Sequence, residues 1–125
     1  MTRLLLCTDL DRTLLPNGPQ PESPEARSRF RLLAQQKQVC LVYVTGRHLA
    51  LVDQAIKNYS IPQPDFIIAD VGSTIYQFKD KRWQLWNVWE QAISRDWGGK
   101  SHADLHQLLT GFKDLRLQEH SKQNC

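Results

Sequence analysis

The chain has 125 residues, 41% hydrophobic and 23% charged, which is typical of a soluble globular protein with one domain, or one domain and part of another. The net charge of +3 comes from 16 basic and 13 acidic residues. The basic residues are scattered, which argues against a nucleic-acid surface and favours small anionic ligands. No apolar run is long enough to cross a membrane, and the three cysteines form neither a metal nor a disulfide pattern, so we expect a cytoplasmic protein.

The first half of the chain alternates short apolar runs with helical patterns. We expect residues 4–8 to form a strand buried on both faces, as in a parallel sheet. Ser23 is the expected N-cap of the next helix, with Pro24 at its first position. Strands are expected at 39–44 and 66–69, with a helix between them that begins near Leu49. The order strand, helix, strand, helix, strand with short connections predicts right-handed crossovers and a parallel sheet.

The pattern changes after Ser73. Residues 74–78 are expected as a strand, Asp80 and Lys81 as a turn, and 83–89 as a return strand or extended segment. A further helix is indicated by a capping-box pattern at its start and by apolar residues at helical spacing, namely Ser101, Asp104, Leu105, Leu108, Leu109, Phe112 and Leu115. The polar stretch 118–125 adds no closing element, so we interpret the chain as one that stops in mid-domain.

Two carboxylates, Asp9 and Asp11, follow the first expected strand. Ligands of open parallel sheets bind beyond the carboxyl ends of the strands, and residues two apart start on one side of a strand. Such a pair can hold Mg²⁺ together with phosphate oxygens. One carboxylate can attack phosphorus while its protonated neighbour acts as acid and then base. A polar loop or a helix cap is the alternative, but the preceding strand and the following Thr13-Leu14 favour catalysis.

The next two strand ends carry further candidates for phosphate binding. Thr45, Gly46 and Arg47 follow the second strand, where a hydroxyl and the amides of a helix N-terminus can bind an anion. A simple helix start with Thr45 as its cap is the alternative, and Arg47 is equally compatible with a solvated position. Gly72 and Ser73 follow the third strand, where a tight turn and a substrate contact are equally good interpretations.

These motifs resemble those of a known family. Asp9-Leu10-Asp11-Arg12-Thr13-Leu14 with Thr45-Gly46-Arg47 is similar to the haloacid dehalogenase-type phosphatases, and residues 69–76 narrow the resemblance to members with an α/β cap after the third strand. The most similar members are the sucrose-6-phosphate phosphatases and the related domain that ends some sucrose-phosphate synthases. The resemblance implies an α/β fold: part of a doubly wound parallel sheet in a three-layer α/β/α core (residues 1–78), and the beginning of an inserted cap (79–125).

The resemblance also implies a function, a Mg²⁺-dependent phosphatase acting on sucrose 6-phosphate or a related sugar phosphate through an aspartyl-phosphate. Asp9 would be the nucleophile and, with the Asp11 backbone carbonyl, a metal ligand, while Asp11 would be the acid and base. Thr45 and the Gly46 amide would hold the phosphate. The alternatives are a non-catalytic fragment or subunit and a phosphatase for another sugar phosphate, such as a mannosyl phosphoglycerate.

One departure from the family bears on activity. Members are about twice as long, and their later half supplies a phosphate-binding lysine and an acidic loop for the metal, which this chain does not offer after Asp96. Most of the cap, which determines specificity, is also missing. Because the later strands flank strand one in the family, we expect that strand's edge to be exposed, which invites a complementing chain or self-association. We expect little activity from this chain alone.

Overall fold

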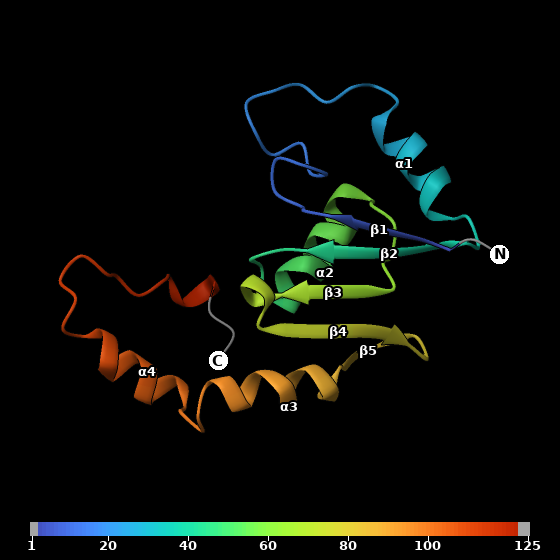
Figure 1. The fold of residues 1–125 in the computed structure, drawn as a ribbon. Coiled ribbons are helices and arrows are strands. Elements are labelled where there is room, and N and C mark those ends of the chain that lie inside the picture. Colours follow the sequence, from blue (N-terminus) through green and yellow to red (C-terminus); the bar gives the residue numbers. More distant parts are fainter. Residues whose placement is uncertain (1–2, 123–125) are drawn as a thin grey trace.

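The computed structural model describes residues 3–122, in which a five-stranded sheet has the spatial order β1-β2-β3-β4-β5 (Figure 1). The first three strands are parallel, and the last two join antiparallel at one side. This confirms the α/β class with a mainly parallel sheet. The strands are β1 (Leu4–Thr8), β2 (Val39–Val44), β3 (Phe66–Ala69), β4 (Thr74–Lys79) and β5 (Arg82–Leu85).

Strand β1 is an edge strand, and the prediction that it is buried on both faces is wrong. Leu4 is 46% exposed, Leu5 is 63% exposed, and Cys7 is also exposed. Cys40, expected in a buried strand as well, is half-buried. The apolar run correctly predicts a strand. The strand is not fully buried because, among the described residues, only β2 pairs with it. The expectation that the edge of this strand is exposed is confirmed.

Two helices follow β1 and β2. The first, α1 (Ala26–Ala34), begins two residues later than expected, with Glu25 as its N-cap and no side-chain cap. The Ser23 carbonyl instead accepts a hydrogen bond from the Ala26 N–H at 3.0 Å, which forms a turn before the helix. The second helix, α2 (Leu49–Tyr59), begins where the sequence predicts.

Both helices pack on one face of the sheet. Phe30 and Ala34 of α1 contact the same buried cluster that includes Val52 and Ala55 of α2. The indole N–H of Trp83 on β5 donates to Asp53 of α2 at 2.8 Å. This bond connects the β4–β5 hairpin to the helices on this face of the sheet. Apolar burial of this kind stabilises the fold. The cluster comprises Leu10, Leu15, Leu41, Tyr43, Val52, Ala55, Ile61, Ile67 and Ala69.

The chain after β5 is helical, so the strand expected over 83–89 ends early. β5 stops at Leu85, and α3 (Asn87–Asp96) begins after Trp86. The capping box before α4 (His102–Leu109) is confirmed: the Ser101 N–H donates to Asp104 at 2.7 Å, and the Asp104 N–H donates to the Ser101 hydroxyl. Helix α4 ends at Leu109, so the helical spacing predicts too long a helix.

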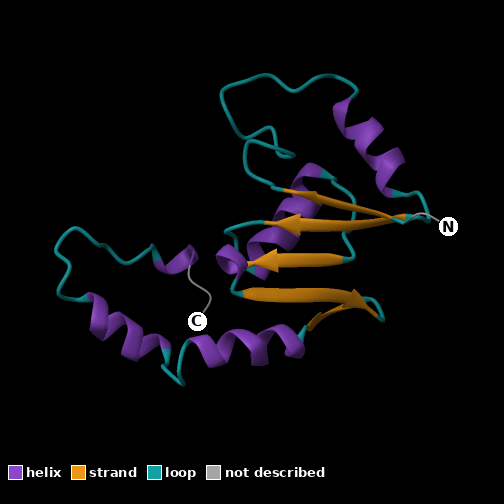
Figure 2. Cartoon of the chain, viewed as in Figure 1, coloured by secondary structure: helices purple, strands orange, loops and turns teal. Residues whose placement is uncertain are grey.

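Helix α3 continues from β5 along the β4 side of the sheet and contacts β4, whereas α4 lies farther from the sheet (Figure 2). No residue of α3 or α4 is buried. Two short 3-10 turns complete the described chain, η1 (Asp70–Gly72) and η2 (His120–Lys122). Over the described residues, no helix combines the length and apolar character needed to cross a membrane.

Candidate active site

Asp9 follows the last residue of β1 and its side chain is held by its own loop. One carboxylate oxygen accepts the Leu10 N–H at 2.7 Å, and the other accepts the Thr13 hydroxyl at 3.2 Å. The residue is exposed. Within the described chain, no basic side chain forms an ion pair with it. Its carboxylate is therefore oriented by these hydrogen bonds and open to an incoming group.

Asp11 is held by an arginine from the neighbouring strand end. Arg47 donates to both of its carboxylate oxygens, from Nε at 2.9 Å and from Nη2 at 2.6 Å, and Asn17 donates at 2.7 Å. The hydrogen bond from Arg47 is the main reason that the pKa of Asp11 lies below its usual value, and burial opposes the shift. Pairing with Arg47 therefore favours the ionised form of Asp11, and the same contact raises the pKa of Arg47.

Thr45, Gly46 and Arg47 form the connection from β2 into α2. Thr45 is only 5% exposed, and its hydroxyl oxygen accepts the Arg47 N–H at 3.1 Å. The Thr45 N–H donates to the Ile68 carbonyl at 2.9 Å, which ties the connection to β3. A Cβ on Gly46 would lie 3.7 Å from Val71 Cγ2, an ordinary contact. The fold itself therefore does not require glycine at position 46.

The turn after β3 has an unusual backbone. Asp70 and Val71 have φ values of 51° and 58°, in the left-handed region, and Gly72 has φ of 91°. This region is unfavourable for a β-branched residue such as Val71, and conformations of this kind cluster at functional sites. The Ser73 hydroxyl donates to the Asp70 carbonyl at 2.8 Å, and the Gly72 carbonyl accepts the Trp89 indole N–H at 3.2 Å.

A cavity of about 510 Å³ lies where these strand ends meet. Three of the predicted site residues line it, namely Asp11, Gly46 and Arg47. The others, Asp9, Thr45, Gly72 and Ser73, are not among its lining residues. The remaining wall comes from Leu51, Val71, Gln118, Ser121 and Lys122.

Two contributions to this region were not found in the sequence. Asn17, in the loop after the carboxylate pair, donates a hydrogen bond to Asp11. The only feature of the sequence that could have indicated this role is an asparagine directly before Gly18 in a loop. The segment 118–122 reaches the cavity from the far end of the chain, where His48 Nε2 lies 3.1 Å from the Ser121 carbonyl. A polar, aperiodic sequence gives no indication of such a long-range contact.

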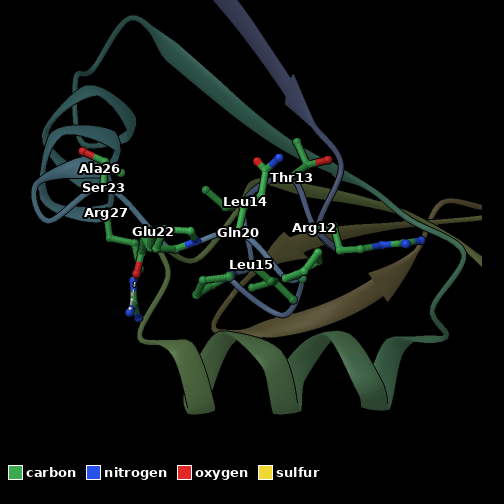
Figure 3. A pocket seen from close by; sticks show the side chains of 13 residues that line it. Arg12, Thr13, Leu14, Leu15, Gln20, Glu22, Ser23, Ala26 and Arg27 are labelled. Carbon is green, nitrogen blue, oxygen red and sulfur yellow. Dashed lines mark hydrogen bonds and ion pairs between the residues drawn. The ribbon is translucent and has the colours of Figure 1, made fainter.

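A second cavity, of about 480 Å³, lies between the proline-rich loop and α1 (Figure 3). Arg12 and Thr13 line it beside the carboxylate loop, and Glu22 and Arg27 line its other side, joined by an ion pair of 2.6 Å. None of the predicted site residues lines this cavity. The polar chemistry of the strand ends is concentrated in the first cavity.

The donor set for a metal is small. Among the described residues there is no group of three or more His, Cys, Asp or Glu side chains that could hold a metal ion. Mg²⁺ commonly binds to only one or two carboxylates and completes its shell with water and substrate phosphate. The exposed carboxylate of Asp9 fits that role, whereas the carboxylate oxygens of Asp11 already accept bonds from Arg47 and Asn17.

Solved structures and related proteins define the class first. The chain aligns over 99% of its length with 46% of the sucrose-phosphatase of Synechocystis sp. PCC6803, crystallised with sucrose and phosphate, at a TM-score of 0.77 and 26% identity. A haloacid dehalogenase-like hydrolase from Bacillus subtilis has the same fold at 19% identity and a TM-score of 0.61. The chain therefore has a haloacid dehalogenase-like fold, as its motifs predict.

The family follows from the sequence. The model of the Sucrose-6F-phosphate phosphohydrolase family matches residues 2–125, and the chain belongs to this family. It is 54% identical over 122 residues to a putative hydrolase of the same class from Nitrosococcus oceani, covering 33% of that protein. It is 27% identical to the mannosylfructose-phosphate phosphatase of Agrobacterium fabrum, covering 46% of it. The chain thus spans less than half the length of these relatives.

Proposed function

We propose that this chain carries the nucleophile of a Mg²⁺-dependent sugar-phosphate phosphatase. The observation that supports this most directly is the meeting of two strand ends: Asp11 after β1 is paired with Arg47 after β2 at 2.6 Å, beside Asp9 and Gly46. Ligands of parallel sheets bind at such carboxyl ends. Membership of a phosphatase family supports a role for these groups in phosphate binding and transfer.

In the proposed reaction, a carboxylate oxygen of Asp9 attacks phosphorus and the bond from phosphorus to the sugar oxygen breaks. Asp11 gives a proton to that oxygen, then takes one from the water that cleaves the aspartyl-phosphate. Bound Mg²⁺ supplies positive charge that lowers the repulsion between the anionic nucleophile and the phosphate. Because Arg47 favours the ionised form of Asp11, proton donation requires this pair to separate.

The phosphate is held, in this proposal, by the connection from β2 to α2. The Thr45 hydroxyl and the Gly46 amide donate to its oxygens, and Arg47 adds a positive charge. Gly46 is not required by packing, which supports a role for its small size in admitting a ligand. Gly72 and Ser73 are proposed as further contacts.

The proposed substrate is sucrose 6-phosphate or a similar sugar phosphate. The family match and the sucrose and phosphate bound by the Synechocystis protein support this class of substrate. In this proposal, residues 1–78 belong to the core domain of the phosphatase and residues 79–125 begin the inserted cap domain. The sheet nevertheless extends past this proposed boundary, to Leu85 at the end of β5. Free thiols at Cys7 and Cys40 support a reducing, cytoplasmic location.

A second candidate is a phosphate-binding subunit without turnover. The restraint of Asp11 by Arg47 and Asn17, and the lack of a larger acidic cluster among the described residues, favour this candidate. The two proposals differ in turnover but share the binding of phosphate.

The test is phosphate release from sucrose 6-phosphate and related sugar phosphates in Mg²⁺, with the purified chain. We expect weak release that Asp9→Asn lowers by at least about a thousandfold, as expected for loss of a nucleophile. Asp114→Asn, at an exposed position far along the chain, is the matched control and leaves the rate unchanged. Release that survives Asp9→Asn contradicts the proposed nucleophile, and phosphate binding without release favours the second candidate.

A further inference from the structure

Arg12 has a backbone conformation that is unfavourable for its residue type. Its φ is 59°, in the left-handed region, which glycine adopts without the steric cost that a side chain brings. The loop fixes this conformation: the Arg12 N–H donates to the Asn17 side-chain oxygen at 2.7 Å, and the Asn17 amide donates to Asp11 at 2.7 Å. Strained positions persist where the surrounding structure holds them, and they cluster at functional sites. Position 12 therefore carries an arginine where the backbone alone favours glycine.

The stem of the Arg12 side chain lies in a gap left by the proline-rich loop (residues 16–21). A Cβ at Gly18 would be 2.9 Å from Arg12 Cγ, closer than side chains pack, and 3.4 Å from Arg12 Cδ. The φ of Gly18 lies outside the left-handed region, so this glycine is needed for space and not for its backbone conformation. The absence of a side chain at position 18 thus gives the Arg12 stem a defined place.

The guanidinium of Arg12 forms no hydrogen bond or ion pair with any of the described residues. Figure 3 shows it extending away from Glu22 and Arg27, which pair with each other. By contrast, Arg47 donates from Nε and Nη2 to Asp11, so its charge is already balanced within the protein. A guanidinium without a protein partner can bind a phosphate through two parallel hydrogen bonds.

The turn after β1 brings Arg12 close to the carboxylate pair. Three consecutive N–H groups after Arg12 donate to one carbonyl of this turn at 2.8–3.2 Å, and the Thr13 hydroxyl donates to Asp9 at 3.2 Å. The chain therefore folds back, and residue 12 lies beside the end of the strand. The hydrogen bond from Arg47 is the main cause of the lowered pKa of Asp11, and the positive charge of Arg12 also lowers it. The two groups are thus within electrostatic range of each other.

We propose that Arg12 is a substrate-binding residue, whose guanidinium holds the phosphate group of the sugar phosphate through charge-assisted hydrogen bonds. This inference rests on the proposed function. Asp9 and Asp11 repel a phosphate dianion, and Arg47 is held by Asp11, so Arg12 supplies a positive charge that is still available to the ligand. Gly18 is a positioning residue, because it leaves the space in which the Arg12 stem lies.

Titration of the purified chain with inorganic phosphate in Mg²⁺, followed by NMR of the arginine Nε–H signals and the backbone amides, tests this assignment. The Arg12 signal is identified by its loss in Arg12→Gln. We expect it to shift with the same dissociation constant as the amides, and Arg12→Gln to weaken the affinity by about tenfold, the effect of one charged hydrogen-bonding group. Arg12→Lys should bind more tightly than Arg12→Gln, because it keeps the charge but not the planar fork.

Arg82→Gln is the matched control for the change in charge. Arg82 is exposed and begins β5, where it pairs with Lys79 at the end of β4 that is remote from Thr74 and the site. Charges that far apart on a surface are largely screened by salt, so we expect this variant to change the affinity for phosphate less than about twofold.

Arg12→Gly separates the side chain from the backbone. It removes the guanidinium but suits a φ of 59°, so phosphate should bind as weakly as to Arg12→Gln, while the melting temperature is at least that of the unmutated chain. A purely structural role for Arg12 predicts the reverse, a lower melting temperature and an unchanged affinity. Circular dichroism measures the melting temperature and checks that each variant folds.

Gly18→Ala tests the position of the stem. In the unmutated background it displaces Arg12 and should weaken phosphate binding, because the added Cβ takes the space of Arg12 Cγ. In the Arg12→Gly background the same change should have no effect on the affinity. An equal loss in both backgrounds would show that Gly18 acts on the site without Arg12.

Three results overturn the inference. Equal effects of Arg12→Gln and Arg82→Gln, or an unchanged affinity in Arg12→Gly, would remove Arg12 from the site and leave the proposed function standing. An unmutated chain that binds no phosphate would remove both. Phosphate release that does not depend on Asp9 would contradict the proposed nucleophile, but the affinities of the Arg12 variants would still decide the role of Arg12.

Discussion

The sheet region of this molecule (residues 4–85) and its C-terminal region (87–122) have similar local order but very different burial. Both contain well-formed helices, and both carry apolar residues at helical spacing. In the sheet region, Val52 and Ala55 of α2 are buried in the common cluster. In the C-terminal region, α4 has no buried residue, and Leu108 is 61% exposed.

The difference shows that apolar residues at helical spacing predict a helix, but do not by themselves determine whether other elements pack against its apolar face. Helix α4 has a complete capping box, so local hydrogen bonds stabilise its first turn. Helix α2 gains the apolar contacts that dominate tertiary stability. We therefore expect the sheet region to determine global unfolding and the C-terminal region to open at a lower free energy. The following predictions test this contrast.

The largest effect is expected from truncating one leucine in each region. Leu41 is 1% exposed on β2, and Leu108 is 61% exposed on α4. Leu41→Ala should lower the free energy of unfolding by about 2–5 kcal/mol because it leaves a cavity, whereas Leu108→Ala should change it by less than about 0.5 kcal/mol. Denaturant unfolding followed by circular dichroism measures both. Equal losses in the two variants would show that α4 is packed after all.

A gain in stability is expected at the strained turn beside the site. Val71 has φ of 58° and an 87% exposed side chain, so it gains little from burial. Val71→Asn should raise the free energy of unfolding by about 1 kcal/mol, because asparagine tolerates the left-handed region. Val88→Asn in α3, at a 68% exposed position, is the control and should not stabilise. A neutral or destabilising result at position 71 would mean that the turn carries no relievable strain.

The ion pair between Arg47 and Asp11 should make stability depend on pH. Since Arg47 lowers the pKa of Asp11 in the folded state from its ordinary 3.8, the pair stabilises above that value and is lost as pH falls through the lowered pKa. Arg47→Gln should cost about 1 kcal/mol at pH 7, after discounting for an Asp11 side chain that is 40% exposed, and almost nothing at the acid end.

Urea unfolding of both proteins across pH 2 to pH 7 measures this difference. The control is Arg29→Gln, which removes an exposed pair with Glu25 on α1 and should have a much smaller effect. A loss from Arg47→Gln that is the same at both ends of the range would show that the arginine acts by packing and not by charge.

The smallest global effect is expected from the cap of α4. Ser101→Ala removes the hydroxyl that accepts the Asp104 N–H, which should destabilise this helix by about 1 kcal/mol. Because α4 buries no residue, the midpoint for unfolding of the sheet should not move. Amide hydrogen exchange should be faster in α4 and unchanged in β2. Faster exchange in both would couple the two regions.

Several elements could be predicted from the sequence because their signals are local. The bounds of β2 and β3, the start of α2 and the capping box of Ser101 and Asp104 all follow from apolar runs or hydrogen-bonding side chains. The exposure of Cys7 could not be predicted from the run that contains it, since burial depends on what the rest of the chain places against a strand.

The candidate site shows the same limit. The sequence singles out Asp11, Gly46 and Arg47 by their place at strand ends, and they line one cavity. It does not predict that Arg47 would pair with Asp11, 36 positions away, nor that Lys122 would reach the same cavity. Such contacts between distant positions depend on the packing of the whole chain.

The central claim is that the ends of β1 and β2 form a phosphate site, and the amides of the isotope-labelled chain test it most directly. On titration with inorganic phosphate in Mg²⁺, we predict that the largest NMR shifts occur at Gly46 and Arg47. Gly46→Ala, which packing tolerates, should lower the affinity by about tenfold while the rest of the spectrum is preserved. Saturable shifts confined to the cavity between the proline-rich loop and α1, or none at all, would contradict the account.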